Sequence, residues 1–419
     1  MSKQKSNNVL AIGIMFFLFA MISFVTGLQN PMGIIAKAQF GATNAMSQLG
    51  NAANFIAYAF LGLPAGFLLK RKGYKVTALA AVAVGFLGVG ISYISGIVGS
   101  FVVYLLGAFV SGFSMCMLNT VVNPMLNTLG GGGNKGNQLI QFGGALNSLA
   151  ATIVPVLAGY LIGEVTEKTQ VADVNVALFI AMGIFALAFV IILFSQIPEP
   201  ELEAAKASNA EEESTGSLIK GALSHKNLIF GVIAIFLYVG IEVGIPNVAN
   251  LYMTDVNGLN IAAGVAGSLV GAYWFLMLIG RLVGGAIGAK VSSRSMMTIV
   301  SSVAVLFLIL GMFLPKTLVL NFQGAAIPVG IFFFVLCGLC TSVMWGSIFN
   351  LAVEGLGKYT SIASGLFMVM VCGGGILPLI QGAVADGFGY MQSYWVLVVA
   401  LLYILWFARV GSKTSKKEA

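Results

Sequence analysis

The sequence predicts an all-α polytopic membrane protein with twelve transmembrane helices, and three observations support this fold class. Hydrophobic residues make up 58% of the 419 residues and charged residues only 8%, whereas a soluble domain typically has about 25% charged residues. The mean hydropathy is +0.98. The apolar residues form continuous runs of the length that a helix needs to cross a bilayer, not the short alternating segments of a β-barrel.

Twelve apolar runs are expected to form the spans. They cover residues 9–36, 44–69, 76–98, 100–127, 138–163, 174–197, 227–253, 261–289, 295–315, 323–350, 360–384 and 391–410. The first run follows a polar, basic stretch, as in a signal peptide. It is too long for that role and lacks a small-residue cleavage site, so we interpret it as a span.

The distribution of Lys and Arg predicts the orientation of these spans. With the N-terminus in the cytoplasm, all but three of the 21 Lys and Arg residues fall in cytoplasmic segments, and only Lys37, Lys168 and Lys316 lie outside. Short cytoplasmic loops carry this excess of positive charge. We therefore expect both termini to be cytoplasmic in a cell (inner) membrane. Because topology accounts for the net charge of +7, no nucleic-acid partner is expected.

A hydrophilic stretch in the middle of the chain predicts two six-helix bundles. We place the N-terminal bundle at 1–197, a cytoplasmic linker at 198–226 and the C-terminal bundle at 227–419, and interpret the glutamates of the linker, Glu199 among them, as solvated. A repeat supports this division. Residues Asn127, Gly132, Lys135, Pro155 and Gly159 recur 223 positions later as Asn350, Gly355, Lys358, Pro378 and Gly382. A six-plus-six parallel repeat is typical of the major facilitator fold.

Glu242 is the one acidic residue that falls inside an apolar run away from its ends, in the stretch FGVIAIFLYVGIEVGIPNVANLYM. A charge near the bilayer midplane costs about 2.5–3.5 kcal/mol on insertion scales, and such residues usually face a bundle interior or a water-filled cavity. Pro246 predicts a helix break one turn later. We therefore expect Glu242 to be functional, either as a titrating group or as a ligand of Na⁺ or of the substrate.

Amide side chains recur at helical spacing within several runs. Gln48, Asn51 and Asn54 share one helix face, and so do Asn119, Asn123 and Asn127. Hydrogen bonding between helices is the plain alternative for any single amide. Taken together with Trp and Tyr, the stripes suit a neutral polyhydroxylated ligand, because amides bond hydroxyl groups and aromatic faces cover a sugar ring.

Charged ligands fit the spans less well. An organic cation would require several acidic residues, and an anion would require Arg or Lys within the membrane. Arg281 lies near the predicted cytoplasmic end of its run, where snorkelling of the side chain to the surface is the simpler interpretation.

Other motifs are expected to carry no chemistry. Cys337 and Cys340 form a C-x-x-C within an apolar run, which favours packing over metal binding, and His225 is the only histidine. The glycine run before Lys135 lacks the Ser or Thr and the preceding strand of a phosphate-binding loop. No cofactor, metal site, obligate protein partner or enzymatic activity is therefore expected.

Several segments resemble known transporters. The loop Gly66–Lys75 resembles the G-x-x-x-D-R-x-G-x-R/K loop of the major facilitator superfamily, with Lys70 in place of the Asp. The strings FLYVGIEV (236–243), WGSIFNLAVEGLGKYT (345–360), NTVVNP (119–124) and LNSLAATIVP (146–155) resemble the superfamily's fucose:proton symporter family, especially its glucose/galactose branch.

This resemblance implies cation-coupled uptake of hexoses. The fucose branch needs two membrane acids for transport, and these positions fall on Asn119 and near Asn30. Both are amides in this chain, which leaves Glu242 as the midplane carboxylate. The resemblance therefore implies proton coupling of a different kind, sodium coupling, or none.

The sequence thus predicts a secondary active transporter that imports a hexose-type sugar with H⁺ or Na⁺ by alternating access. The alternatives are an uncoupled sugar facilitator and, with less support, a multidrug exporter. Glu242 is the expected coupling residue. The residues expected to bind the sugar are Gln29, Asn30, Gln48, Asn51, Asn54, Asn119, Asn123, Gln141, Asn147, Asn250 and Trp345. Asn147 lies off the helix face of Gln141, so the two need not reach one cavity.

Overall fold

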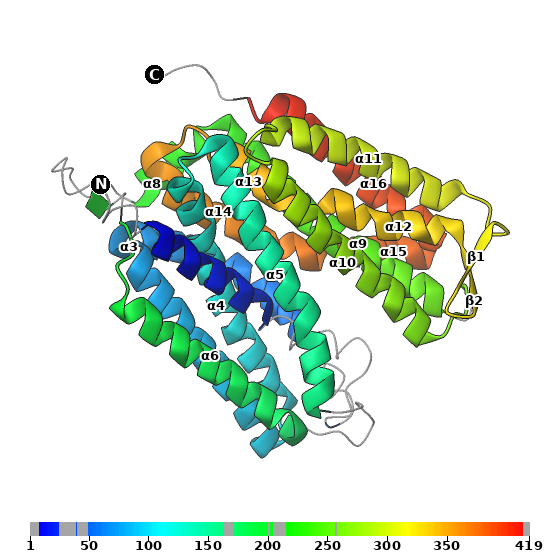
Figure 1. Cartoon of the computed structure of the whole chain (residues 1–419), viewed down its shortest axis with the longest axis horizontal. Helices are drawn as coiled ribbons and strands as arrows, with labels where there is room; N and C mark the ends of the chain where they lie inside the picture. Colours follow the sequence, from blue (N-terminus) through cyan, green and yellow to red (C-terminus); the bar gives the residue numbers. More distant parts are fainter. Residues whose placement is uncertain are drawn as a thin grey trace. The chain divides into compact units, whose positions relative to one another are not determined.

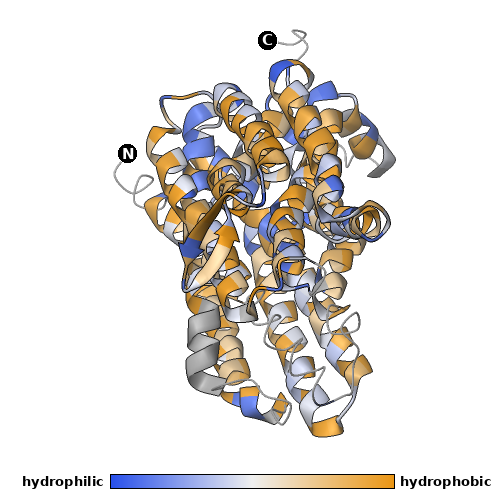
Figure 2. Ribbon diagram, turned by 90° about the vertical axis from the view of Figure 1, so that its right-hand side faces the viewer, coloured by the Kyte–Doolittle hydropathy of each residue, from blue (hydrophilic) through white to orange (hydrophobic). Residues whose placement is uncertain are grey.

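The computed structural model describes residues 8–24, 39, 49–162, 171–199, 202–203, 215–255 and 258–413. This part of the chain is helical apart from one β-hairpin (Figure 1). Most turns of the helices are apolar, and polar residues gather at the helix ends and in a few interior turns (Figure 2).

The first half contributes a helix at Asn8–Phe24, followed by α3 (Leu49–Val98), α4 (Phe101–Leu129), α5 (Gly133–Ile162), the short turn η1 (Val171–Val174) and α6 (Asn175–Phe194). After α8 (Thr215–Leu223), the second half contributes α9 (Lys226–Thr254), α10 (Ala263–Ile287), α11 (Ser293–Phe313), α12 (Val329–Thr341), α13 (Met344–Val353), η2 (Gly357–Tyr359), α14 (Thr360–Val369), η3 (Met370–Cys372), α15 (Gly373–Phe388), α16 (Tyr390–Trp406) and η4 (Phe407–Gly411).

These helices match the twelve expected spans. Helix α3 holds the second and third spans on either side of a break at Gly73. The tenth span is the pair α12 and α13, and the eleventh is the pair α14 and α15 joined by η3. The first span is described only as far as Phe24.

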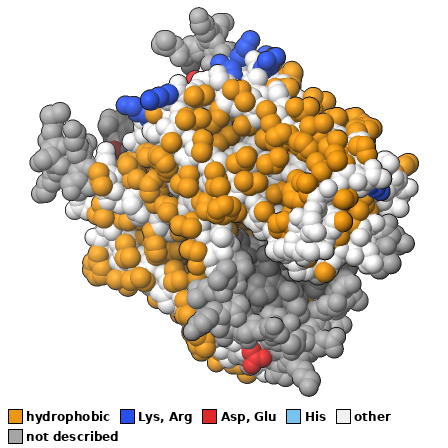
Figure 3. Space-filling model, turned by 45° about the vertical axis from the view of Figure 1, so that its right-hand side comes forward, with side chains coloured by type: hydrophobic (Ala, Val, Ile, Leu, Met, Phe, Trp, Pro, Cys, Tyr) orange, Lys and Arg blue, Asp and Glu red, His pale blue; other side chains and the backbone are white. Residues whose placement is uncertain are grey.

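Large apolar side chains cover the outside of the helices. Phe194, Leu379 and Phe388 are 82%, 75% and 76% exposed, which would be costly in water and is favourable against lipid. Figure 3 shows hydrophobic side chains over much of the face that is not grey, with Lys and Arg visible mainly near its upper edge. The described chain is therefore a polytopic helical membrane protein.

The break in α3 is held by Glu199. Gly73 has φ +82°, which favours glycine, and the backbone N–H groups of Tyr74 and Lys75 donate to the two carboxylate oxygens of Glu199 at 2.7 and 2.8 Å. Our interpretation of Glu199 as a solvated linker residue is therefore wrong. It caps the restarted helix, because a carboxylate satisfies the free N–H groups of a helix start.

The hairpin is absent from our prediction, which began an apolar run at residue 323. Strands β1 (Val319–Phe322) and β2 (Ala325–Pro328) pair antiparallel with Phe322 opposite Ala325. Gln323 and Gly324 both have positive φ, as a two-residue hairpin turn requires. The helix of the tenth span therefore begins only at Val329.

The chain divides into two compact units. Unit 1 comprises Met1–Leu129, Leu146–Ser224 and Leu356–Val369, and unit 2 comprises Gly130–Ala145, His225–Gly355 and Met370–Ala419. Each unit thus contains one segment from the other half of the sequence. The predicted boundaries at the central linker stay a prediction.

The two exchanged segments are held by equivalent bonds. In unit 2, Gln141 Nε2 donates to the carbonyl of Val343 at 2.8 Å. In unit 1, Ser364 Oγ donates to the carbonyl of Thr120 at 3.2 Å. Gln141 and Ser364 are 223 positions apart, as are Thr120 and Val343, so the repeat seen in the sequence extends to contacts.

Candidate functional site

Glu242 forms an ion pair with Arg281 inside unit 2. The Arg281 NH2 nitrogen lies 3.2 Å from Glu242 Oε1, and the two side chains are only 10% and 14% exposed. Our expectation that Arg281 snorkels to the surface is wrong, because the side chain turns inward to the buried carboxylate. A buried charge requires such a partner, since desolvation of one unpaired ion costs several kcal/mol.

Arg281 also bonds two backbone carbonyl groups from other segments. Its NH1 donates to the carbonyl of Gly144 in α5 at 3.0 Å, and its Nε donates to the carbonyl of Ser342, between α12 and α13, at 3.3 Å. The planar guanidinium offers donors in a rigid fork, so one side chain fastens α5, α9 and the α12–α13 junction to α10.

Pro246 explains a second link between α9 and α10. Proline has no N–H group, so the carbonyl of Glu242, four residues earlier, lacks its helical partner. The hydroxyl of Tyr273 in α10 donates to this carbonyl at 3.2 Å and lies 3.0 Å from Thr341 Oγ1. Helix α10 therefore holds Glu242 at two points, by its carboxylate and by its backbone.

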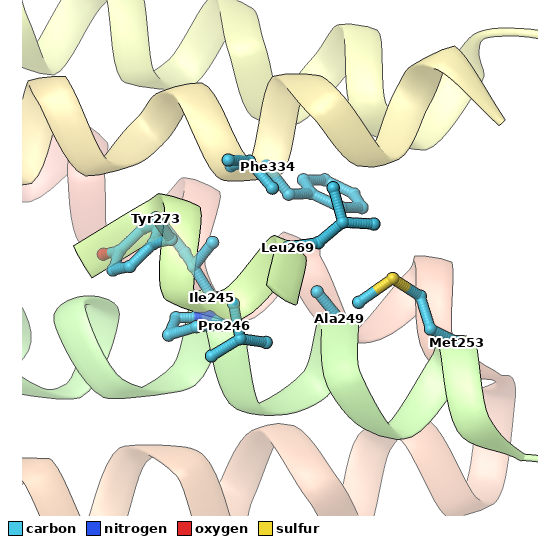
Figure 4. Close-up of a pocket in the computed structure, with 9 residues that line it drawn as sticks. Ile245, Pro246, Ala249, Met253, Leu269, Tyr273 and Phe334 are labelled. Atoms are coloured by element: carbon cyan, nitrogen blue, oxygen red, sulfur yellow. The ribbon is translucent and has the colours of Figure 1, made fainter. Parts of the chain in front are cut away.

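A small cavity lies beside the proline break. It measures about 10 Å³ and is lined by Ile245, Pro246, Ala249, Met253, Leu269, Val270, Tyr273, Phe334 and Val335. In Figure 4 the hydroxyl of Tyr273 lies on the side of its ring away from Leu269 and Met253. A cavity of this volume holds at most about one water molecule, so this apolar space is not a sugar site.

An aromatic pair from α9 and α13 lies near the ion pair, and a buried amide of α15 packs against α9 two residues from Glu242. Tyr238 lies within electrostatic reach of both charges, and its ring meets that of Trp345 edge to face at 6.3 Å. Gln381 in α15 is fully buried near Gly244, and among the described residues neither amide atom has a hydrogen-bond partner. Trp345, an expected sugar residue, therefore lies one side chain away from the charged pair.

Unit 1 contains a neutral polar cluster on α3 and α4. Asn119 Nδ2 donates to the Tyr58 hydroxyl at 3.0 Å, and Asn123 Nδ2 donates to the carbonyl of Asn119 at 2.8 Å. Asn54 is 4% exposed, and its amide atoms have no partner within the described part of the chain. The structure thus brings Asn119 and Asn123 together. Asn54 lies one helical turn before Tyr58 on α3 and packs against Gly112 of α4.

The amides of the fifth span divide between the two units. Gln141 bonds Val343 in unit 2, as described above, while Asn147 Nδ2 donates to the carbonyl of Phe19 in unit 1 at 2.9 Å. The two side chains do point to different surroundings, as their spacing indicates. Gln141 is buried, and its nitrogen donates to a backbone carbonyl. Its predicted role in sugar binding stays a prediction.

The remaining expected residues are less fully defined. Asn250 in α9 is half-buried. Gln29, Asn30, Gln48 and the side chain of Asn51 lie outside the described residues. The described residues contain no group of His, Cys, Asp and Glu suited to a metal ion.

Sequence reasoning missed Tyr273 and Arg281 as partners of Glu242. One signal was present, because a proline four residues after Glu242 frees the carbonyl of that residue and predicts a nearby donor. Tyr273 and Arg281 are eight residues apart on α10, close to two helical turns, so both face the same neighbour.

A polytopic bundle of twelve spans, built from two repeated halves with a buried ion pair and amide clusters, defines a membrane transporter rather than an enzyme. The chain belongs to the Major Facilitator Superfamily, whose family model matches residues 12–378.

Relatives of known description cover nearly the whole chain. A "Glucose/galactose transporter" of Brucella abortus biovar 1 (strain 9-941) is 27% identical over 416 residues, which is 99% of this chain and 96% of that protein. An "L-fucose-proton symporter" of Escherichia coli (strain K12) is 23% identical and covers 96% and 92% of the two chains. The crystal structure of the transporter FucP in the outward conformation matches with a TM-score of 0.81 at 20% identity, covering 97% of this chain and all of that one.

Proposed function

We propose that the protein is a secondary active transporter that imports a hexose-type sugar together with a cation. The observation that carries the proposal is the buried pair of Glu242 and Arg281, because a membrane carboxylate whose charge can be balanced in two ways is what coupling to H⁺ or Na⁺ requires. The names of the relatives, a glucose/galactose transporter and a fucose-proton symporter, support a sugar as the substrate.

The neutral amides support the same substrate class. Asn54 and Gln381 are buried with free donors and acceptors among the described residues, and leaving such groups unsatisfied costs about 1–3 kcal/mol each. Hydroxyl groups of a sugar offset this cost, because each hydroxyl both donates and accepts. We keep Asn54, Asn119 and Trp345 as the foremost candidates for sugar contact.

The test is uptake of labelled glucose, galactose and fucose into proteoliposomes under an imposed proton gradient, an imposed sodium gradient or neither. We expect one gradient to drive accumulation. Glu242→Gln should abolish accumulation and leave counterflow exchange intact, because an amide cannot carry the charge. Glu354→Gln, which changes an exposed carboxyl group in the same unit, is the matched control and should transport normally.

An uncoupled facilitator is the second candidate, and one observation favours it. Arg281 already balances the charge of Glu242, so no cation is needed to keep the carboxylate buried. This alternative predicts equal inward and outward sugar concentrations under every gradient. Loss of sugar binding itself in Glu242→Gln would instead make Glu242 a sugar ligand.

The proposed location is the inner membrane with both termini cytoplasmic. The support is the excess of Lys and Arg in the alternate loops. A reporter enzyme that is active only in the cytoplasm, fused after residue 419 or within the loop at residue 316, should be active in the first fusion and inactive in the second.

A further inference from the structure

The side chain of Arg281 joins a group that can change charge to a segment that crosses between the two units. It donates to the Glu242 carboxylate on α9 and to the Gly144 carbonyl on α5. Gly144 lies in the last turn of the segment Gly130–Ala145, which packs in unit 2, while the rest of α5 packs in unit 1. One guanidinium therefore contacts both the candidate coupling residue and the end of the exchanged segment.

The fit at Gly144 is close. A Cβ added to Gly144 would lie 3.3 Å from Arg281 Cδ, which is tighter than an ordinary van der Waals contact. Two neutral bonds hold the same segment at other points, from Gln138 Nε2 to the Gly285 carbonyl at 2.9 Å and from Gln141 Nε2 to the Val343 carbonyl. Of these bonds, only the one from Arg281 depends on a charged side chain.

The repeat shows that this charged bond is an addition. The Gln141 bond has a counterpart in unit 1, the Ser364 bond described above. Arg281 corresponds by the same 223 positions to Tyr58, which is uncharged and accepts a hydrogen bond from Asn119. The contacts that hold α5 in unit 2 thus include a charged side chain, and the equivalent position in unit 1 has none.

We propose that Arg281 is a positioning residue. It makes the packing of residues 130–145 in unit 2 depend on the charge of Glu242. The inference deepens the proposed function, since it names how a charge change at Glu242 would reach a helix. An ionised Glu242 fixes the guanidinium in the plane from which it bonds Gly144. When a proton or a cation neutralises Glu242, the buried guanidinium loses its counter-charge and turns to another acceptor, and the Gly144 carbonyl is released.

Few other groups compete for this role among the described residues. Arg281 from α10 contacts the Glu242 carboxylate, and Tyr238 from α9 lies within electrostatic range of it. Tyr273 from α10 lies within electrostatic range, and Cys337 from α12 lies next to Tyr273. Tyr238, Tyr273 and Cys337 are all neutral near physiological pH, which leaves Arg281 as the charged partner.

The test is a distance measurement by double electron–electron resonance on the full chain in nanodiscs. Spin labels at Lys135→Cys and Lys290→Cys report the distance between the first turn of α5 and the turn that follows α10. Both positions are exposed and belong to unit 2. The background replaces Cys116, Cys337, Cys340 and Cys372 with alanine and is first checked for uptake. Labels at Lys290→Cys and Lys413→Cys, also in unit 2, provide a control distance that does not involve α5.

We expect one narrow distance distribution at high pH. Acidification should add a second, longer population, because it protonates Glu242. Glu242→Gln should show that second population at every pH. Arg281→Lys keeps the charge beside Glu242 but loses the fork, so it should also show the longer population with no pH response. Arg294→Lys, at another arginine of unit 2 that bonds Ser412, should behave as the unmodified protein.

An unchanged α5 distance in both Glu242→Gln and Arg281→Lys would overturn the inference, as would an equal change in the control distance. The transport assay separates this failure from failure of the proposed function. If Glu242→Gln loses concentrative uptake without any change in distance, the proposed link is wrong and the proposed transport function stands. If the distance changes while gradient-driven uptake stays intact, Glu242 is not the coupling residue and the link stands.

Discussion

Units 1 and 2 make one hydrogen bond at equivalent positions with different chemistry. In unit 1, Asn119 donates to Tyr58 at 3.0 Å. In unit 2, Arg281 donates to the carbonyl of Ser342 at 3.3 Å. Each residue of the first pair lies 223 positions before its counterpart in the second. The same two positions of the repeat are therefore in contact in both units, but the donor and acceptor positions are exchanged and only the bond in unit 2 involves a charged side chain.

The difference indicates a division of roles. Neutral amides exchange hydrogen-bond partners at low cost. The neutral polar cluster on α3 and α4 therefore suits a ligand that carries hydroxyl groups. A buried ion pair is expensive to break but responds to a single proton. We therefore expect changes in unit 1 to alter sugar affinity and changes in unit 2 to alter stability and coupling.

The largest expected effect is in unit 2. Arg281→Met should lower the free energy of unfolding by about 3–5 kcal/mol, because it leaves Glu242 buried and unpaired. Denaturant unfolding in detergent, followed by Trp fluorescence, measures this loss. The double variant Glu242→Gln, Arg281→Met should recover most of it, since no buried charge remains. Equal losses in the single and double variants would mean that packing, not charge, sets the cost.

A smaller effect is expected one bond away. Tyr273→Phe removes the donor that satisfies the Glu242 carbonyl, and a buried carbonyl without a partner costs about 1–3 kcal/mol. The variant Pro246→Ala restores an N–H group to α9, so Tyr273→Phe should cost less in that background. A cost that does not depend on residue 246 would contradict our account of the proline break.

The smallest effect on stability is expected in unit 1. Tyr58→Phe removes one acceptor from Asn119, which keeps its bond to the Met115 carbonyl, so a loss of about 0.6 kcal/mol is expected from typical interhelical bonds. The same variant should weaken sugar binding measured by isothermal titration. A loss of stability as large as that of Arg281→Met would remove the contrast between the two units.

Much of this fold follows from the lengths of the apolar runs, because a bilayer requires each span to satisfy its own backbone groups. The hairpin at Val319–Pro328 could not be predicted in this way, because its strands are as apolar as the span that follows. The exchange of segments between units could not be predicted either. Helix α5 is continuous from Gly133 to Ile162, and nothing in its periodicity indicates that its two ends pack against different partners.

The candidate site was predicted in part. The cost of a charge in an apolar run identified Glu242 without any contact information. For Arg281, the short distance to the end of the apolar run predicted a side chain that extends to the membrane surface, and this prediction is wrong. Position along a helix does not reveal which way a long side chain turns. Helical spacing grouped Asn119 with Asn123 correctly, but which amides are satisfied by protein is a tertiary property.

The exchanged segments have a consequence for how the chain assembles. A cut in the central linker would give two fragments, yet unit 1 includes Leu356–Val369 and unit 2 includes Gly130–Ala145. Each fragment would then lack a piece of the unit that it mostly builds. Neither should reach its native packing when produced alone, whereas the two produced together should complement each other. During synthesis, we therefore expect unit 1 to complete its packing only after Leu356–Val369 has been made.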